Sequence, residues 1–215
     1  KVLYIFIVLR FKSKRNLSFL ELNFRKIDFT NYKQVKLFIF KKNFYLNKNK
    51  NIHTFDFLNF SKKLGGKIGI SLSKDVIFDW YQVYKNKIGF PWLEDLQSKR
   101  LINLLYNYEY INSSSKISDK KKLDSIIYFH IQRVMLDFKN KKINQLTSFD
   151  IIAYLLSCFI TKKINEDKID YIKFIVERQV DKLGMHKSYN ILEHAKFINN
   201  LNEAKNILLF FKSNK

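Results

Sequence analysis

Apolar and polar residues change their spacing along this chain, and the change divides it into two parts. From about residue 75 onward, apolar residues recur every three or four positions, which places them on one face of an α-helix. Before that point the pattern is less regular, and residues 20–25 and 35–40 favour short β-strands. The pattern predicts a mainly α protein with a helical domain over 71–215. An irregular arm with short β-strands over 1–70 precedes it.

The helical part is expected to hold about six helices in antiparallel hairpins with short turns. The clearest stripe lies in residues 118–138, where Ser118 and Asp119 are expected to cap the helix. Its apolar stripe consists of Leu123, Ile126, Ile127, His130, Ile131, Val134 and Phe138. A histidine on such a stripe is expected to be a hydrogen-bonded core residue rather than a catalytic one.

Residues that favour helix ends predict the boundaries of the other helices. Gly89 ends one helix, and Pro91 suits the first turn of the next because it has no N–H to lose. Thr147 and Asp150 have the spacing of a capping box, and the helix that follows is apolar on nearly all sides, so it is expected to be buried. Asn165 is expected to cap the next helix. The last helix is expected to bury Leu192, Ala195, Ile198, Leu201, Ala204, Leu208 and Phe211.

Composition supports a helical protein and narrows its chemistry. The 215 residues include one proline and five glycines, which favours long helices with few tight turns. The one cysteine, Cys158, excludes a disulfide within the chain and is expected to be a buried thiol. No phosphate-binding glycine loop, Cys/His metal cluster or nucleophile elbow is present, so we expect no metal and no cofactor. The apolar run at residues 2–9 is too short to span a bilayer.

The formal net charge of +21 has two explanations. It suits a polyanionic partner such as an acidic polysaccharide, a nucleic acid or an anionic membrane. It also suits compositional drift in an AT-rich coding sequence, because Lys, Asn, Ile, Phe and Tyr are abundant while arginine is scarce. The two explanations are compatible.

A glycine separates two predicted helices in residues 179–190, QVDKLGMHKSYN. Gly184 is expected to end the first helix in the left-handed conformation, and Ser188 or Asn190 to cap the second. These capping roles leave His186 and His194 unexplained, which makes both candidates for function.

The same stretch resembles the "Q-[IV]-x-x-D-G-G-H-x-S-R-N-P" signature of the heparinase II/III family. Residues 91–96, PWLEDL, are similar to the family's "W-L-x-D-L" motif, and the resemblance covers about residues 76–212. It implies part of an incomplete α/α toroid from an acidic-polysaccharide lyase. Such enzymes break the chain by β-elimination at a uronic acid. The resemblance also implies a periplasmic or secreted bacterial protein.

The chain departs from the signature at Leu183, Met185, Tyr189 and Ile191. The family's carboxy-terminal β-sandwich has no counterpart before Lys215, and the first residue is not Met, so the segment is expected to be incomplete as a lyase. On this hypothesis His186 and His194 are the catalytic candidates. Substrate contacts are assigned to Asn144, Asn190 and Trp92.

Two alternatives to a lyase remain open. One is a non-catalytic basic helical domain that binds acidic glycans. The other is a nucleic-acid-binding protein, for which Tyr106, Tyr108 and Tyr110 would be exposed stacking aromatics. Basic residues are spread along the chain rather than clustered, which disfavours the second alternative.

Overall fold

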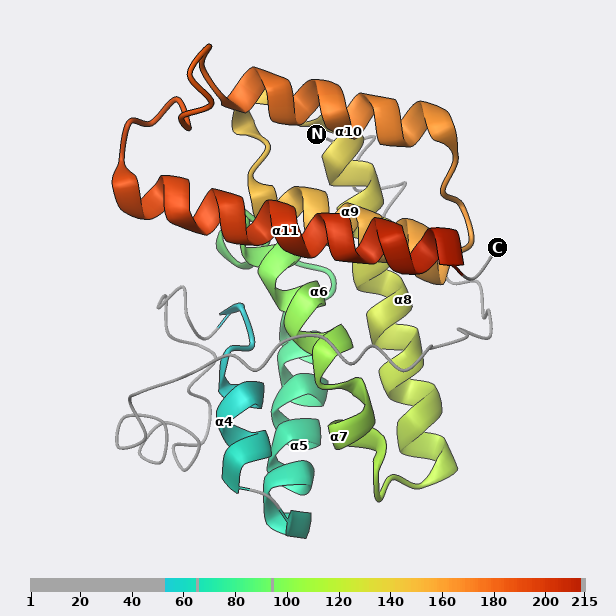
Figure 1. Cartoon of the computed structure of the whole chain (residues 1–215). Coiled ribbons are helices and arrows are strands. Elements are labelled where there is room, and N and C mark those ends of the chain that lie inside the picture. The colour runs from blue at the N-terminus through green and yellow to red at the C-terminus, as the bar shows by residue number, and fades with distance from the viewer. Residues whose placement is uncertain (1–52, 65, 94, 214–215) are drawn as a thin grey trace. The chain divides into compact units, whose positions relative to one another are not determined.

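The computed structural model describes residues 53–64, 66–93 and 95–213, and in these ranges the protein is helical (Figure 1). Its α-helices are α4 (Phe57–Leu64), α5 (Gly66–Tyr84), α6 (Leu96–Tyr106), α7 (Tyr108–Asn112), α8 (Ile117–Asn140), α9 (Ser148–Ile160), α10 (Glu166–Gln179) and α11 (Ile191–Ser213). Short 3-10 turns, η2 (Phe90–Trp92) and η3 (Ile143–Gln145), lie between them. The prediction of a mainly α protein is therefore confirmed, and the six helices expected after residue 75 are all present.

The helical part begins earlier than the sequence pattern predicted. Helix α4 and the first turns of α5 fall within residues 57–70, which were expected to be irregular, whereas both predicted β-strands lie outside the described residues. Gly69 does not interrupt the helix, because it is a packing residue inside α5. A Cβ atom there would come within 2.5 Å of the Tyr110 hydroxyl and 2.9 Å of the Ser61 carbonyl oxygen. Glycine thus permits close contact between α4, α5 and α7.

The structure separates into two compact units, residues 1–130 and 131–215, with α8 contributing residues to both. Among the described residues, no helix combines the length and the unbroken apolarity that crossing a bilayer requires.

The core of the first unit is built around the buried guanidinium of Arg100. Its Cζ lies 4.1 Å from the ring centroid of Trp80 and 4.5 Å from that of Trp92, so two indoles take part in cation–π contacts with it. Its Nη1 donates to the carbonyl oxygens of Pro91 (3.0 Å) and His53 (2.5 Å). The planar guanidinium thereby connects the segment before α4, the η2 turn and α6.

His130 of α8 also bonds to Arg100, and the two hydrogen bonds of its ring determine its tautomer. Arg100 Nε donates to His130 Nε2 at 2.9 Å, so Nε2 is an acceptor. Nδ1 then carries the proton and donates to the Ile126 carbonyl oxygen, 2.8 Å away. The histidine is fully buried, as the sequence pattern predicted, and the other six members of its stripe are buried as well.

Arg100→Lys should lower the stability of the first unit by about 2 to 3 kcal/mol, because an ammonium cannot reproduce the planar fork of hydrogen bonds. The two tryptophans of the chain both lie in this core, so their fluorescence reports its unfolding in urea. Arg178→Lys, at an exposed position on α10, is the matched control and should change stability by less than about 0.5 kcal/mol. Equal effects of the two substitutions would contradict the role given to Arg100.

Tyr108 and Asp124 form a second polar contact in the first unit. The Tyr108 hydroxyl donates to Asp124 Oδ1 at 2.7 Å, and the ring is only 8% exposed. Burial, followed by the adjacent carboxylate, raises the pKa of Tyr108 far above its ordinary value. Tyr110 donates its hydroxyl to the Ser61 carbonyl oxygen at 2.6 Å. Tyr108 is buried and Tyr106 and Tyr110 are only partly exposed, so the predicted row of exposed tyrosines is wrong.

The raised pKa of Tyr108 gives a stability contribution that is complete below the unfolded-state pKa of about 10 and is lost as the pH rises above it. Tyr108→Phe should therefore be less stable at pH 8, while the difference from the native protein narrows between about pH 10 and 11. Urea titrations followed by tryptophan fluorescence measure this difference at each pH. A difference that stays constant over this range would contradict the shift.

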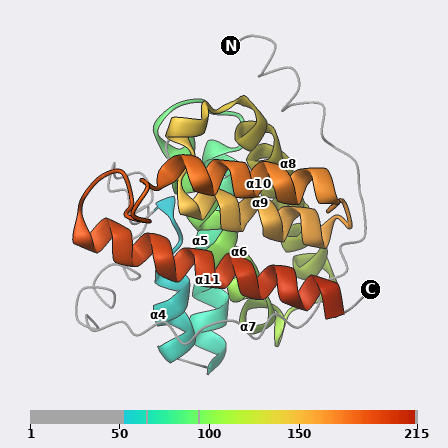
Figure 2. The same ribbon diagram turned by 45° about the horizontal axis from the view of Figure 1, so that its top comes forward.

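In the second unit, α9 and α11 run in the same direction and contact each other, while α10 runs in the opposite direction (Figures 1 and 2). Every residue of α9 from Asp150 to Ile160 is buried, as expected for a helix that is apolar on all sides.

Cys158 lies among these buried residues of α9, and burial raises the pKa of its thiol. The Phe138 ring of α8 stacks on the Tyr154 ring of α9 with centroids 4.0 Å apart.

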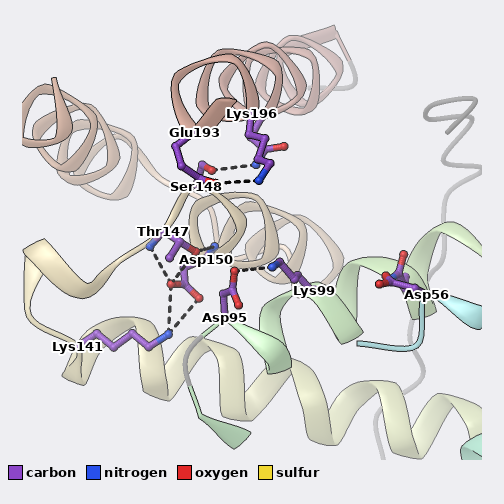
Figure 3. A network of polar contacts seen from close by, with 11 residues as sticks. Asp56, Asp95, Lys99, Lys141, Thr147, Ser148, Asp150, Glu193 and Lys196 are labelled. Atoms are coloured by element: carbon purple, nitrogen blue, oxygen red, sulfur yellow. Dashed lines mark hydrogen bonds and ion pairs between the residues drawn. The ribbon is translucent and has the colours of Figure 1, made fainter. Parts of the chain in front are cut away.

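The predicted capping box of α9 is present and extends into a wider polar network (Figure 3). Asp150 Oδ2 accepts from the Thr147 backbone N–H at 2.9 Å, and the Thr147 hydroxyl oxygen accepts from the Asp150 N–H at 3.3 Å. Lys141 Nζ lies 3.2 Å from both Asp150 oxygens and 3.1 Å from Asp137. Burial lowers the pKa of Lys141, but the two carboxylates outweigh burial and raise it overall. The network anchors the end of α8 to the start of α9.

The predicted inner face of α11 is wrong at several positions. Leu192, Ala195 and Ile198 are exposed, whereas Phe197, Asn200, Glu203 and Ile207 are buried; Ala204 is buried as predicted. Apolar residues occur on both sides of this helix, so periodicity alone did not identify the packed side. Asn200 helps to determine the packed side of α11, because its Nδ2 donates to the Ser148 hydroxyl oxygen at the start of α9 (2.8 Å).

Candidate functional site

The candidate site is the turn over residues 180–190, together with the first residues of α11. Helix α10 ends at Gln179, five residues before Gly184, so the prediction that this glycine ends the helix is wrong. Gly184 does adopt the predicted left-handed conformation, with φ +80°. The turn is closed by an isolated antiparallel bridge between Val180 and His186 and by a 3.0 Å bond from the Lys187 N–H to the Gln179 carbonyl oxygen.

An aspartate organises the tip of the turn. Asp181 Oδ1 accepts hydrogen bonds from the backbone N–H groups of Leu183 and Met185, each at 2.9 Å. The Asp181 N–H donates to the Met185 carbonyl oxygen at 2.8 Å. Side-chain bonds of this kind, from a residue to backbone groups two and four positions later, stabilise a tight turn without regular structure. The tip therefore has a defined shape although Leu183 is 89% exposed.

The turn brings His186 and His194 together. The His186 backbone N–H donates to Nδ1 of His194 at 3.2 Å. The Ser188 N–H donates to Nδ1 of His186 at 3.2 Å, and the Ser188 hydroxyl lies 2.8 Å from the same nitrogen. Both Nδ1 atoms therefore act as acceptors, and each neutral ring carries its proton on Nε2.

Packing holds one imidazole in place and leaves part of both accessible. The His186 ring centroid lies 4.9 Å from that of Phe197, which is buried. Both histidines are partly exposed. An imidazole N–H that a ligand can reach can donate a hydrogen bond to an anion or transfer a proton. This geometry could not be read from the sequence, because the bond between His186 and His194 depends on how the turn closes.

Asn190 has the capping role that the sequence predicted. Its Oδ1 accepts from the backbone N–H groups of Leu192 (2.9 Å) and Glu193 (3.2 Å), at the start of α11. Tyr189 precedes it with φ +52°, an unfavourable conformation for a tyrosine, and its ring is 70% exposed. The Asn190 amide nitrogen remains the part of this side chain that a ligand could contact.

Asn144 lies in a segment that is tied to the same turn. It belongs to the η3 turn and is exposed. The Gln179 side-chain nitrogen donates to the carbonyl oxygen of Leu146, two residues after Asn144, and the Gln179 carbonyl oxygen accepts from Lys187. Gln179 thus connects the η3 segment to the turn. The sequence placed Gln179 in the motif, but this link depends on how the chain folds.

Trp92, the remaining candidate, lies in the first unit. Its ring is 6% exposed, it faces the Arg100 guanidinium, and its Nε1 donates to the Tyr84 carbonyl oxygen at 3.1 Å. Sugar stacking needs an exposed ring face, so this geometry favours a core role for Trp92. Among the described residues, no group of three or more His, Cys, Asp or Glu side chains is arranged to hold a metal ion.

Comparisons with protein-family models, curated proteins and solved structures found no match to this chain.

Asn190→Ala should lower the stability of the second unit by about 1 kcal/mol, because two N–H groups of α11 lose their acceptor. Asn190→Ser retains an N-cap oxygen and should stay within about 0.5 kcal/mol of the native protein. Urea unfolding followed by far-ultraviolet circular dichroism measures both. Equal losses from the two substitutions would show that the capping oxygen is not what Asn190 contributes.

Proposed function

We propose that the second unit binds an acidic, uronate-containing polysaccharide at the turn between α10 and α11. The observation that carries this proposal is the hydrogen-bonded pair His186 and His194, in which both Nδ1 atoms accept bonds and both Nε2 atoms carry the proton. Imidazole N–H groups, the Asn190 amide and the Asn144 amide are suitable donors to a sugar carboxylate. Exposed Lys182 and Lys187 add positive charge to the same turn.

We further propose that this turn serves a β-elimination, as the resemblance to the heparinase II/III family implies. In that reaction a base removes the C5 proton of the uronate, the electron pair forms the C4–C5 double bond, and the C4–O bond breaks. The departing oxygen then takes up a proton. An imidazole that donates to the carboxylate lowers the barrier to loss of the C5 proton, and a second imidazole can act as the acid or base.

On this proposal the protein is the helical part of a heparinase II/III-like lyase and belongs to an α/α toroid. Groups outside residues 131–215 complete the catalytic set. Binding without elimination is the second form of the proposal, because the turn contains donors for a carboxylate whether or not a base is present. Nucleic acid is less favoured as the partner, because the tyrosines expected to stack on bases are internally bonded or packed.

The proposal is tested with uronate polysaccharides such as polygalacturonate, alginate and hyaluronan. Their carboxyl-reduced forms serve as matched neutral ligands. Binding is measured by affinity electrophoresis, and elimination by the ultraviolet absorbance of the unsaturated uronate that it creates. We expect binding to the acidic polymers and at least roughly tenfold weaker binding to the reduced ones, because a charge-assisted hydrogen bond is lost at each uronate.

His186→Asn and His194→Asn separate the two nitrogens of each ring, because the asparagine Oδ1 takes the place of Nδ1 as an acceptor while Nε2 is removed. Each should reduce elimination by about 10²- to 10⁴-fold if the ring transfers a proton. Asn199→Ala, at an exposed position on α11, is the control and should change neither readout.

Three outcomes distinguish the lyase, the non-catalytic binding domain and a protein that does not recognise acidic polysaccharide. Binding with elimination that depends on the histidines supports the lyase. Binding that depends on the histidines, without elimination, supports the non-catalytic form and rejects the reaction. Equal affinity for acidic and carboxyl-reduced polymers, or tight binding only to nucleic acid with a steep salt dependence, would reject the polysaccharide proposal.

A further inference from the structure

One end of the first unit gathers lysines from two separate stretches of sequence. In the stretch 62–68, residues 62–64 end α4 and residues 66–68 begin α5, while residues 116–122 lead into and begin α8. Lys74 Nζ of α5 lies 3.2 Å from Asp119 Oδ2 and 3.4 Å from the Ser115 hydroxyl oxygen, which holds α5 against the second stretch. Figures 1 and 2 show these helix ends at the same end of the unit. We call this surface the lysine end.

The lysine end carries a strong positive charge. Its two stretches contain seven lysines and one acidic residue, Asp119, whose carboxylate is paired with Lys74. The lysines at positions 62, 67, 116, 120, 121 and 122 are all exposed. Helices α5 and α8 both begin here, so the positive ends of two long helix dipoles add to the same field. An anionic surface is the complementary partner.

Two isoleucines distinguish this surface from an ordinary basic patch. Ile68 is 74% exposed and Ile117 is 75% exposed, and each directly follows an exposed lysine. A hydrated polyanion such as a nucleic acid or a polysaccharide gains little from branched aliphatic side chains in water. A bilayer interface accommodates both kinds of residue, because ammonium groups remain at the phosphate level while aliphatic groups enter the acyl boundary.

We infer that the lysine end docks on an anionic phospholipid bilayer. Lys67 and Lys116, with Lys120 and Lys121, contact lipid phosphates and carboxylates, and Ile68 and Ile117 insert at the interface. Attachment is peripheral and reversible, since it rests on charge and two side chains. The inference is independent of the polysaccharide proposal, which concerns the second unit.

Vesicle flotation with the full chain tests the inference. The vesicles contain either phosphatidylcholine alone or a mixture of phosphatidylcholine and phosphatidylserine. Binding is expected only to the mixed vesicles and should weaken as salt is added. The triple variant Lys116→Gln, Lys120→Gln, Lys121→Gln should lose on the order of a hundredfold in partition coefficient. The matched control Lys139→Gln, Lys163→Gln, Lys205→Gln removes the same charge at exposed positions elsewhere and should lose less than about tenfold.

The isoleucines provide the test that separates a bilayer from other polyanions. The double variant Ile68→Ser, Ile117→Ser keeps every charge and should lose roughly tenfold or more in partition coefficient. Its circular dichroism should match that of the native protein because both side chains are exposed. Unchanged vesicle binding by this variant would overturn the inference and leave a purely electrostatic polyanion site. The inference would also be overturned if the two triple lysine variants lost equally in partition coefficient, or if the native protein bound vesicles made of phosphatidylcholine alone.

Discussion

The first unit depends on a buried positive charge that has been removed from water. Burying a guanidinium is costly unless its hydrogen bonds are replaced and its charge is stabilised. Here two carbonyl oxygens and the Nε2 atom of His130 replace water, and the faces of Trp80 and Trp92 stabilise the charge. These partners come from four separate segments, so the cation is satisfied only when all of them are assembled. Arg100 therefore makes the core specific as well as stable.

In the second unit, the polar groups that need partners are the backbone N–H groups at the helix starts. The first N–H groups of a helix need acceptors, and here Thr147, Asn165 and Asn190 provide them for α9, α10 and α11. The Asp150 carboxylate connects one of these ends to Lys141, and the Gln179 side chain connects α10 to the carbonyl oxygen of Leu146. Polar contacts at helix ends therefore help to position the turn that holds His186.

The sequence predicted those features of the fold that depend on local interactions. The buried stripe of α8, the fully buried α9 and the caps at Thr147 and Asn190 follow from spacing and from side chains close in sequence. Features that depend on distant residues were missed. The close approach of the Tyr110 hydroxyl and the Ser61 carbonyl oxygen requires a glycine at position 69, and the packed side of α11 depends partly on Ser148. The candidate site divides in the same way: the motif and the residues that follow it identified both histidines, whereas the bond between them depends on how the turn closes.

Helix α9 also constrains how the protein is made. All of its sides are covered in the folded unit, and part of the cover comes from α11, where Asn200 and Phe210 contact Ser148 and Phe159. Asn200 follows Ser148 by 52 residues and Phe210 follows Phe159 by 51 residues, so a ribosome synthesises α9 well before these partners. During that interval a strongly apolar helix leaves the ribosome without its cover. Newly made chains are therefore most vulnerable to aggregation, and most dependent on chaperones, just before synthesis of α11 is complete.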